Sequence, residues 1–294
     1  MHGARPAAQE PDALLGSEHL RRRLHPRTGT QPHGPDGGAT RLQPAAGHDR
    51  RNPDHVICRG PLGSGKTTCV RALFTEIEET TDRFIPVYVD CRIDWTPDAV
   101  FSRIFAKLTG QPPAEEMGEW DVARAVADLL RERKAVLGVC LNDIGYLGSR
   151  SEINRALYML LRLHESYRGA KVGVVAIVND LTYNLPADLD APVFSVFYPV
   201  EIFFPPLYAK EIRDVLRDRV QQGLAPDVVP ARVLARVVER TRDNGDIRVG
   251  LDLLKGAVTL AEQDGRRSVT QENVCMVYES SVADPYLRMS CGPE

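Results

Sequence analysis

The residues best suited to chemistry form the run Gly60-Pro-Leu-Gly-Ser-Gly-Lys-Thr67, which matches the phosphate-binding pattern G-x-x-x-x-G-K-[ST]. Its glycines allow backbone angles that turn several N–H groups toward a β-phosphate. Lys66 is expected to reach the β- and γ-phosphates, and the Thr67 hydroxyl is expected to bind Mg²⁺. The motif predicts an ATP or ADP site with Mg²⁺, formed by Gly60, Pro61, Leu62, Gly63, Ser64, Gly65, Lys66, Thr67 and Thr68.

A second polar pair, Asn142-Asp143, follows the apolar run over residues 135–141. In P-loop ATPases a carboxylate at the end of such a strand holds the Mg²⁺ shell, and an acidic neighbour polarises the attacking water. Here the metal-side position is the neutral Asn142, and the water-side position is Asp143. Losing one charge near a divalent ion costs a few kcal/mol, which predicts that ATP binds but turns over slowly. The alternative interpretation is that Asp143 itself serves the metal, and the sequence leaves both open.

Two more residues are candidates for contacts with a γ-phosphate. Asn179 follows the apolar run over residues 171–178, where an amide is expected to orient the phosphate or its attacking water. The alternative interpretation is an ordinary turn, because Asn and Asp are common in turns. Arg248 opens a predicted helix after Gly245-Asp-Ile, where an arginine is suited to close onto the phosphate. The alternative interpretation is that Arg248 is an ordinary surface arginine.

The elements that must position these residues alternate between strands and helices. Near-continuous apolar runs predict buried strands at 56–59, 84–90, 135–141 and 171–178, with a short fifth strand at 201–204. Helical patterns between the strands indicate an α/β fold with a parallel sheet flanked by helices. After Pro206 only helices are expected, near residues 208–222, 230–242, 247–262 and 270–280. We predict a P-loop domain over residues 56–206 and a small all-helical lid domain over residues 207–294.

The first 55 residues differ in composition from the remainder of the chain. They are rich in Pro, Gly, Arg and His, and we expect a low-complexity, largely disordered tail whose histidines are solvated. The 294-residue chain has a formal charge of only -3, so any nucleic-acid contact must be local. No run is long enough to span a membrane. Six scattered cysteines predict reduced, mostly buried thiols, so a cytoplasmic location is expected.

Taken together, these motifs resemble those of the AAA+ ATPases and, more narrowly, the archaeal origin-recognition initiators of DNA replication. The resemblance runs from about Val56 to about Ser280 and is most specific at residues 84–91, 171–180, 201–206 and 245–254. It implies Walker A residues at Lys66 and Thr67, Walker B at Asn142 and Asp143, sensor 1 at Asn179 and sensor 2 at Arg248. It also implies tight ATP or ADP binding, origin DNA as a ligand, a nucleoid-associated location, and other initiator subunits or the replicative helicase as partners.

Four features depart from the family pattern. The chain ends at Glu294, before the winged-helix domain expected in the family. Residues 191–194, Ala-Pro-Val-Phe, stand where the resemblance implies an arginine finger. Walker B has Asn142 in place of its first carboxylate, and the tip of the 96–133 insertion, expected to contact DNA, carries the acidic Glu115 and Glu116.

The leading interpretation is therefore an ATP-binding initiator-type protein with slow hydrolysis and weak DNA binding. The second is a non-catalytic, nucleotide-dependent regulatory module that partners full-length AAA+ initiators. A P-loop kinase acting on a small molecule and a transposition- or restriction-linked AAA+ ATPase are further alternatives.

Overall fold

The computed structural model describes residues 53–167 and 169–283, with side chains to Ser280. The predicted tail lies outside the described residues except at its end, residues 53–55. The chain divides into two compact units, one comprising the chain to Gly60 with Gly65–Phe204, the other Pro61–Ser64 with the chain from Pro205.

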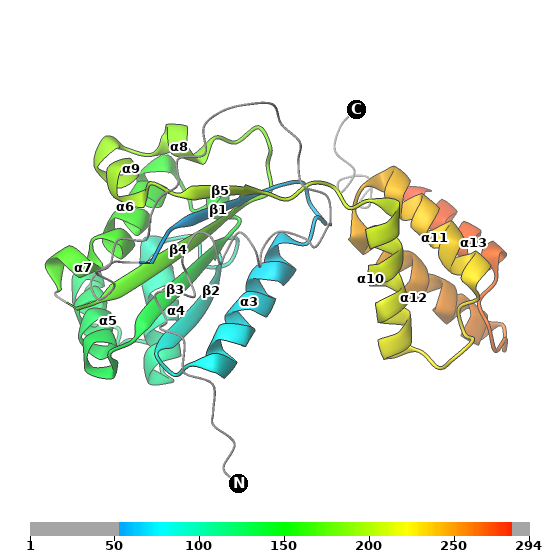
Figure 1. The fold of residues 1–294 in the computed structure, drawn as a ribbon, viewed down its shortest axis with the longest axis horizontal. Coiled ribbons are helices and arrows are strands. Elements are labelled where there is room, and N and C mark those ends of the chain that lie inside the picture. The colour runs from blue at the N-terminus through cyan, green and yellow to red at the C-terminus, as the bar shows by residue number, and fades with distance from the viewer. Residues whose placement is uncertain (1–52, 168, 284–294) are drawn as a thin grey trace, which may run out of the picture. The chain divides into compact units, whose positions relative to one another are not determined.

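The first unit is built on a five-stranded parallel sheet (Figure 1). Its strands are β1 (Val56–Arg59), β2 (Phe84–Asp90), β3 (Val136–Asn142), β4 (Lys171–Val178) and β5 (Val200–Phe203), in the spatial order β2-β3-β4-β1-β5. Each neighbouring pair is parallel. The predicted parallel sheet is confirmed, with every strand within one residue of its expected bounds.

Helices cover both faces of the sheet because alternate residues of each strand point to opposite sides. On one face, Val56, Cys58 and Cys140 pack with the apolar side of α3 (Lys66–Thr80). On the other face, Ile57, Leu137 and their neighbours pack with the remaining helices of the unit. These helices are α4 (Pro97–Thr109), α5 (Glu119–Arg133), η1 (Ile144–Tyr146), α6 (Arg150–Leu161), α7 (Leu163–Ser166), α8 (Leu185–Asp188) and α9 (Ala191–Phe197).

The segment expected to be a DNA-contacting insertion, residues 96–133, consists mainly of the core helices α4 and α5. Phe101 and Ile104 of α4 and Leu130 of α5 are fully buried in the main cluster. Only the connection between the helices is mostly exposed, and it includes Glu115 and Glu116. The apolar faces of both helices therefore pack in the core, and contact of this segment with DNA stays a prediction.

The described cysteines agree with the expectation of unpaired thiols. Cys58, Cys91 and Cys140 are buried, and Cys69 and Cys275 are partly exposed. Burial raises the pKa of the Cys58 thiol to about 12. Of the smaller effects, Cys69 also raises this pKa and Lys66 lowers it. Such a thiol is neutral at pH 7 and behaves as an apolar side chain.

Gly138 lies in the middle of β3 because the ring of Phe84 occupies the space where a side chain would stand. A Cβ atom at this position would lie 2.1 Å from Phe84 Cζ. The ring also makes an edge-on contact with Phe74, at a centroid distance of 5.8 Å. The close approach therefore requires glycine here.

Replacing Gly138 by Ala is expected to lower the free energy of unfolding by about 2 kcal/mol, since a filled core must shift to admit the methyl group. Urea denaturation measures this change. The double variant Gly138→Ala/Phe84→Leu should be more stable than the additive sum of its single changes. Gly223→Ala is the control, because no heavy atom lies within 4 Å of that Cβ position. Equal losses in the two glycine variants would refute this account.

His55 corrects the expectation that all the tail histidines are solvated. Its Nδ1 accepts a hydrogen bond from the Val174 amide at 3.1 Å, and its ring lies 5.6 Å from that of Phe197. Its carbonyl accepts a hydrogen bond from the Val200 amide at 2.8 Å, so the residue connects β4, β5 and α9. Burial lowers the pKa of His55 from 6.5 to about 4, against the opposing effect of Asp54.

This shift predicts an acid-sensitive fold. The unfolded chain binds a proton at pH values below about 6.5, whereas folded His55 resists protonation until about pH 4, so stability falls as the pH falls between those values. The loss between pH 7 and pH 5 is expected to be about 2 kcal/mol. Urea titrations at both pH values measure it. His55→Gln should remove most of this difference, and an undiminished difference in that variant would assign it to other groups.

The second unit consists of the helices expected after Pro206. They are α10 (Ala209–Gly223), α11 (Ala231–Asn244), α12 (Ile247–Gln263) and α13 (Gln271–Ala283). Their apolar faces form a separate core that includes Leu216, Val237 and Leu254. The four predicted lid helices are thus present, and the α/β fold with a helical lid is confirmed.

Candidate functional site

The loop between β1 and α3 has the backbone that the phosphate-binding motif requires. Gly63 and Gly65 have φ values of 73° and 88°, which side-chain-bearing residues rarely adopt. Gly65 is the N-cap of α3, and no described side chain caps that helix end. The N–H groups of the first turn are therefore suited to an anion, which the helix dipole also favours.

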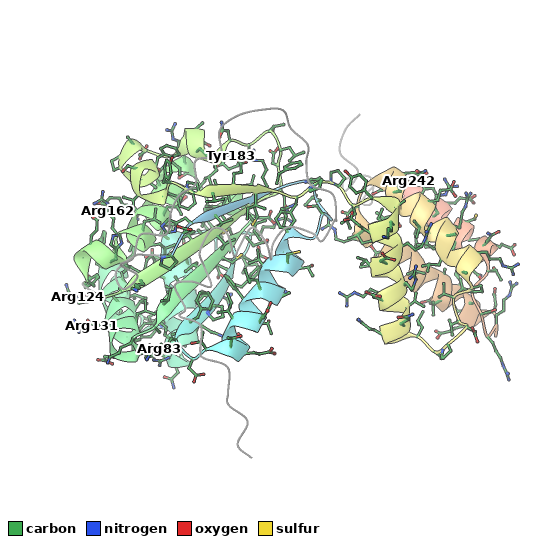
Figure 2. The ribbon with its side chains drawn as sticks, viewed as in Figure 1. Arg83, Arg124, Arg131, Arg162, Tyr183 and Arg242 are labelled. Carbon is green, nitrogen blue, oxygen red and sulfur yellow. The ribbon has the colours of Figure 1, made fainter. Side chains whose placement is uncertain are left out.

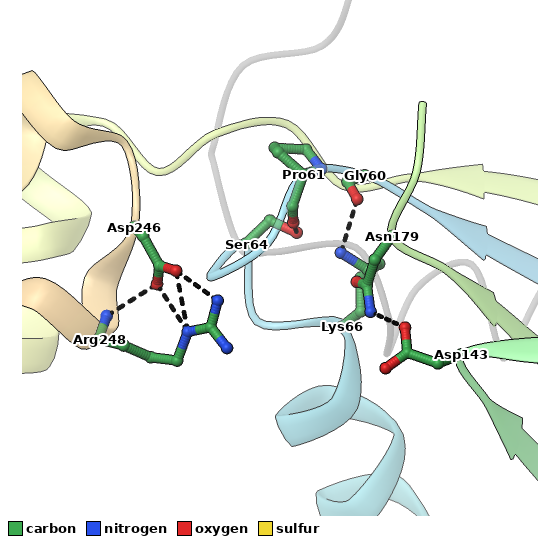
Figure 3. Close-up of polar contacts among 8 residues, drawn as sticks. All are labelled: Gly60, Pro61, Ser64, Lys66, Asp143, Asn179, Asp246 and Arg248. Atoms are coloured by element: carbon green, nitrogen blue, oxygen red, sulfur yellow. Dashed lines mark hydrogen bonds and ion pairs between the residues drawn. The ribbon is translucent and has the colours of Figure 1, made fainter. Parts of the chain in front are cut away.

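Two side chains of this loop donate hydrogen bonds to backbone carbonyls of the loop itself. Lys66 is buried, and its ammonium donates to the Gly60 carbonyl at 2.7 Å (Figure 3). The Ser64 hydroxyl donates to the Pro61 carbonyl at 2.8 Å. Thr67 and Thr68 follow in the first turn of α3, where Thr67 is partly exposed and Thr68 is exposed. All the predicted P-loop residues thus lie in this strand–loop–helix unit.

The predicted residues on β3 and β4 converge at the same edge of the sheet, because parallel strands end together there. The Thr67 hydroxyl donates to Asn142 Oδ1 at 2.9 Å. The Asn142 amide lies 3.4 Å from Asp143 Oδ2, and the Asn179 amide donates to Asp143 Oδ1 (Figure 3). Asn142 and Asp143 are both buried. The structure therefore brings Thr67, Asn142, Asp143 and Asn179 into one polar cluster.

Asp143 is directed into this cluster by an unusual backbone conformation. Its φ of 57° and ψ of 50° place it in the left-handed region, which Asp and Asn tolerate better than most residues. It stands between the last residue of β3 and the short helix η1.

One further side chain contacts this cluster, and the sequence did not point to it. Arg92, two residues beyond the end of β2, places its Nε 3.0 Å from Asp143 Oδ2. Its guanidinium carbon also lies 4.7 Å from the centre of the Tyr146 ring. The position of Arg92 could have been predicted from the sequence, because the end of β2 lies at the same sheet edge as the ends of β3 and β4.

The oxygen atoms of this cluster suit Mg²⁺ that arrives with a nucleotide. Mg²⁺ is usually held by one or two protein oxygens together with phosphate oxygens and water. Thr67 Oγ1, Asn142 Oδ1 and the Asp143 carboxylate offer such oxygens. Within the described chain, no three His, Cys, Asp or Glu side chains form a group that could hold a metal by themselves. The donor set therefore fits a metal shared with phosphates.

The remaining predicted residue, Arg248, belongs to the second unit. It lies in the first turn of α12, where its backbone N–H and its Nε donate to Asp246 Oδ1 at 2.9 and 3.0 Å (Figure 3). Asp246 is the N-cap of this helix and is buried. The Gly-Asp-Ile-Arg sequence thus forms a helix start with a paired arginine, and its contact with a γ-phosphate stays a prediction.

Two family models match the chain in the order of its two units. The AAA domain matches residues 49–180, and the Cdc6 AAA+ ATPase-type lid domain matches residues 213–279. The chain belongs to the AAA+ ATPases and carries a Cdc6-type lid.

Several archaeal ORC1-type DNA replication proteins are similar to the chain. ORC1-type DNA replication protein 3 of Haloarcula marismortui is 43% identical over 242 residues, which are 82% of this chain and 64% of the relative. ORC1-type DNA replication protein 2 of Methanosarcina mazei is 41% identical over 230 residues, covering 78% of this chain and 61% of the relative. The chain thus matches somewhat under two thirds of the length of these ORC1-type relatives.

Solved structures of the family show the same fold. The Aeropyrum pernix ORC1 protein in complex with DNA gives a TM-score of 0.67 at 26% identity, covering 78% of this chain and 60% of that one. The Aeropyrum pernix ORC2 protein, solved in ADPNP-ADP complexes, gives 0.68 at 24% identity, covering 77% and 62%. Among the described residues, the helices are too short or too polar to span a bilayer.

Proposed function

We propose that this protein binds ATP or ADP with Mg²⁺ at the P-loop and acts in the initiation of DNA replication. The observation that carries nucleotide binding is the convergence of Lys66, Thr67, Asn142, Asp143 and Asn179 beside a glycine-rich loop. In this proposal the loop amides and Lys66 hold the phosphates, and Thr67 with Asn142 faces the metal. Mg²⁺ supplies charge neutralisation when it is bound.

Asp143 and Asn179 are the residues proposed to act on the attacking water. In hydrolysis the water oxygen bonds to the γ-phosphorus while the bond to the bridging oxygen of ADP breaks, giving ADP and inorganic phosphate. Asp143 is suited to take the proton of the water, and Asn179 orients the Asp143 carboxylate. Slow turnover is supported by the neutral Asn142 and by the donors that already occupy Asp143.

The replication role rests on the ORC1-type relatives. Their name and the Aeropyrum pernix complex with DNA support origin DNA as a ligand. Other initiator subunits or the replicative helicase are the proposed partners, in the cytoplasm at the nucleoid. Several arginines of the first unit lie where its strands begin, among them Arg131 and Arg162 (Figure 2). These two are paired with Asp128 and Glu165, which supports only weak DNA binding.

The nucleotide carried by the purified protein tests the central part of this proposal. We expect close to one ADP or ATP per chain after acid extraction and chromatography. A protein purified without nucleotide that also fails to bind ATP at millimolar concentration would contradict the proposal.

DNA binding is tested by titrating the protein onto origin fragments at two salt concentrations. We expect weak association that is lost as salt rises, because phosphate contacts release counterions. A nanomolar, sequence-specific footprint would contradict weak binding and would support the replication role more strongly. Chromatin immunoprecipitation in the native cell then tests that role, and an absence of enrichment at replication start sites would contradict it.

A second candidate function is a nucleotide-dependent regulatory module without catalysis. It is favoured by Asn142 and by residues 191–194, which form the first turn of α9 where the family resemblance implies an arginine finger. Turnover distinguishes the two functions. Tight ATP binding with hydrolysis no faster than in Lys66→Ala would favour the regulatory module.

A further inference from the structure

Arg59 is the last residue of β1, directly before the P-loop, and its side chain connects three segments of the first unit. Its Nε pairs with the Glu201 carboxylate of β5. Its Nη1 donates to the Tyr183 carbonyl at 2.7 Å and lies 3.5 Å from the Leu181 carbonyl. The side chain is only 15% exposed, so these contacts are largely shielded from water. None of the proposed contacts with the nucleotide involves this arginine.

The alternation of side chains along β1 places Arg59 on the face of the sheet opposite α3. Ile57 packs in the cluster on that opposite face, whereas Cys58 packs in the cluster that includes the apolar side of α3. Arg59 therefore points to the same side as Ile57. The phosphates are expected at the start of α3, so the contacts of Arg59 reach the proposed nucleotide site through the loop that they hold.

The segment that Arg59 holds is the loop that begins with Asn179. Asn179 directly follows the last residue of β4, and its amide donates to Asp143 Oδ1. Thr182 donates from its amide and its hydroxyl to Asp180 Oδ1, at 2.8 and 2.6 Å, which closes a tight turn. The turn is thus fixed by its own hydrogen bonds and by Arg59 at its end, which leaves Asn179 little freedom to move.

Tyr183 extends this contact to the segment that carries Asp143. A Cβ atom at Gly145 would lie 3.6 Å from Tyr183 Cδ1, so the Tyr183 ring packs beside that residue. Gly145 belongs to η1 and follows Asp143 by two positions. Arg59 therefore joins the strand that leads into the P-loop to both residues proposed to act on the attacking water, Asp143 and Asn179.

We propose that Arg59 is a positioning residue, which fixes the Asn179 amide relative to the P-loop where that amide contacts the γ-phosphate of ATP. This inference rests on the proposed nucleotide site. ADP lacks the γ-phosphate, so the contribution of Arg59 concerns ATP and not ADP. Loss of the arginine should therefore reduce the discrimination between the two nucleotides.

Equilibrium binding of ATP and of ADP to the full chain tests this role. Arg59→Gln is expected to raise the dissociation constant for ATP about fivefold, as the loss of one hydrogen bond would. The dissociation constant for ADP should stay within about twofold of wild type. Arg59→Lys should lose part of the discrimination, because one ammonium replaces the separate nitrogens that contact Tyr183 and Glu201. Arg133→Gln is the control and should change neither constant, since Arg133 also donates to a backbone carbonyl, that of Leu108, at 2.7 Å.

A double variant shows whether Arg59 acts through Asn179. In an Asn179→Ala background, Arg59→Gln should cause no further loss of ATP affinity, because the amide that it positions is gone. An equal loss of ATP and ADP affinity in Arg59→Gln, or no loss of either, would overturn the role of Arg59 while leaving nucleotide binding intact. If Arg59→Gln does not fold, wild-type discrimination in Arg59→Lys would overturn it. Failure of the wild-type chain to bind ATP would instead overturn the proposed function, and this inference with it.

Discussion

Replacing Lys66 by Ala is expected to weaken ATP binding at least about a hundredfold, which corresponds to about 3 kcal/mol. The ammonium is buried at the P-loop, where its Nζ already donates to the Gly60 carbonyl. A phosphate placed there would gain a charge-assisted hydrogen bond in a site that excludes most water. Titration with a fluorescent ATP analogue, checked by calorimetry, measures the loss.

Lys210→Ala is the matched control for this variant, because Lys210 is an exposed lysine near the start of α10. It should bind ATP like wild type. Lys66→Ala should remain folded, since the substitution removes a charge whose burial is unfavourable without an anion. Thermal denaturation verifies this. A folded Lys66→Ala protein with wild-type affinity would show that the nucleotide binds elsewhere.

The sheet and the order of the helices could be predicted because local patterns determine them. Buried parallel strands are continuous apolar runs, so their bounds are visible in the sequence. Two strands, β3 and β5, are shifted by one residue from their expected bounds, and the shift of β3 can be explained. Asn142 was placed after β3 because its side chain is polar, yet its backbone pairs with Asp90 of β2. A polar side chain at the end of a strand does not end the backbone pairing, and the same pairing places Asn142 beside Thr67.

The features that the sequence did not reveal depend on contacts between distant parts of the chain. His55 is separated by 119 residues from Val174, whose amide it accepts, so composition alone assigned it to the solvated tail. Arg92 and Asp143 are likewise far apart in sequence and meet only because β2 and β3 are neighbours in the sheet. Residues 96–133 were assigned by resemblance to a DNA-contacting insertion. The apolar faces of α4 and α5 lie in the core, and the contact of this segment with DNA stays a prediction.

Asn142→Asp is expected to speed ATP hydrolysis roughly thirtyfold, equivalent to about 2 kcal/mol in the transition state. The substitution restores a carboxylate beside Thr67, where the family resemblance places one. Single-turnover assays across a range of Mg²⁺ concentrations measure both the rate and the concentration for half-maximal activity, which should fall. Asn184→Asp, which adds the same charge at an exposed position, should change neither.

The nucleotide-free protein supplies an independent measurement for this variant. A second carboxylate at position 142 would replace the amide that lies 3.4 Å from Asp143 Oδ2, so two negative charges would face each other. Without a cation this repulsion should lower the melting temperature, and Mg²⁺ with ATP should restore it. If Asp143 serves the metal by itself, Asn142→Asp should instead leave the rate and the Mg²⁺ dependence unchanged, while Asp143→Asn abolishes both. The two interpretations that the sequence left open therefore predict different results for Asn142→Asp.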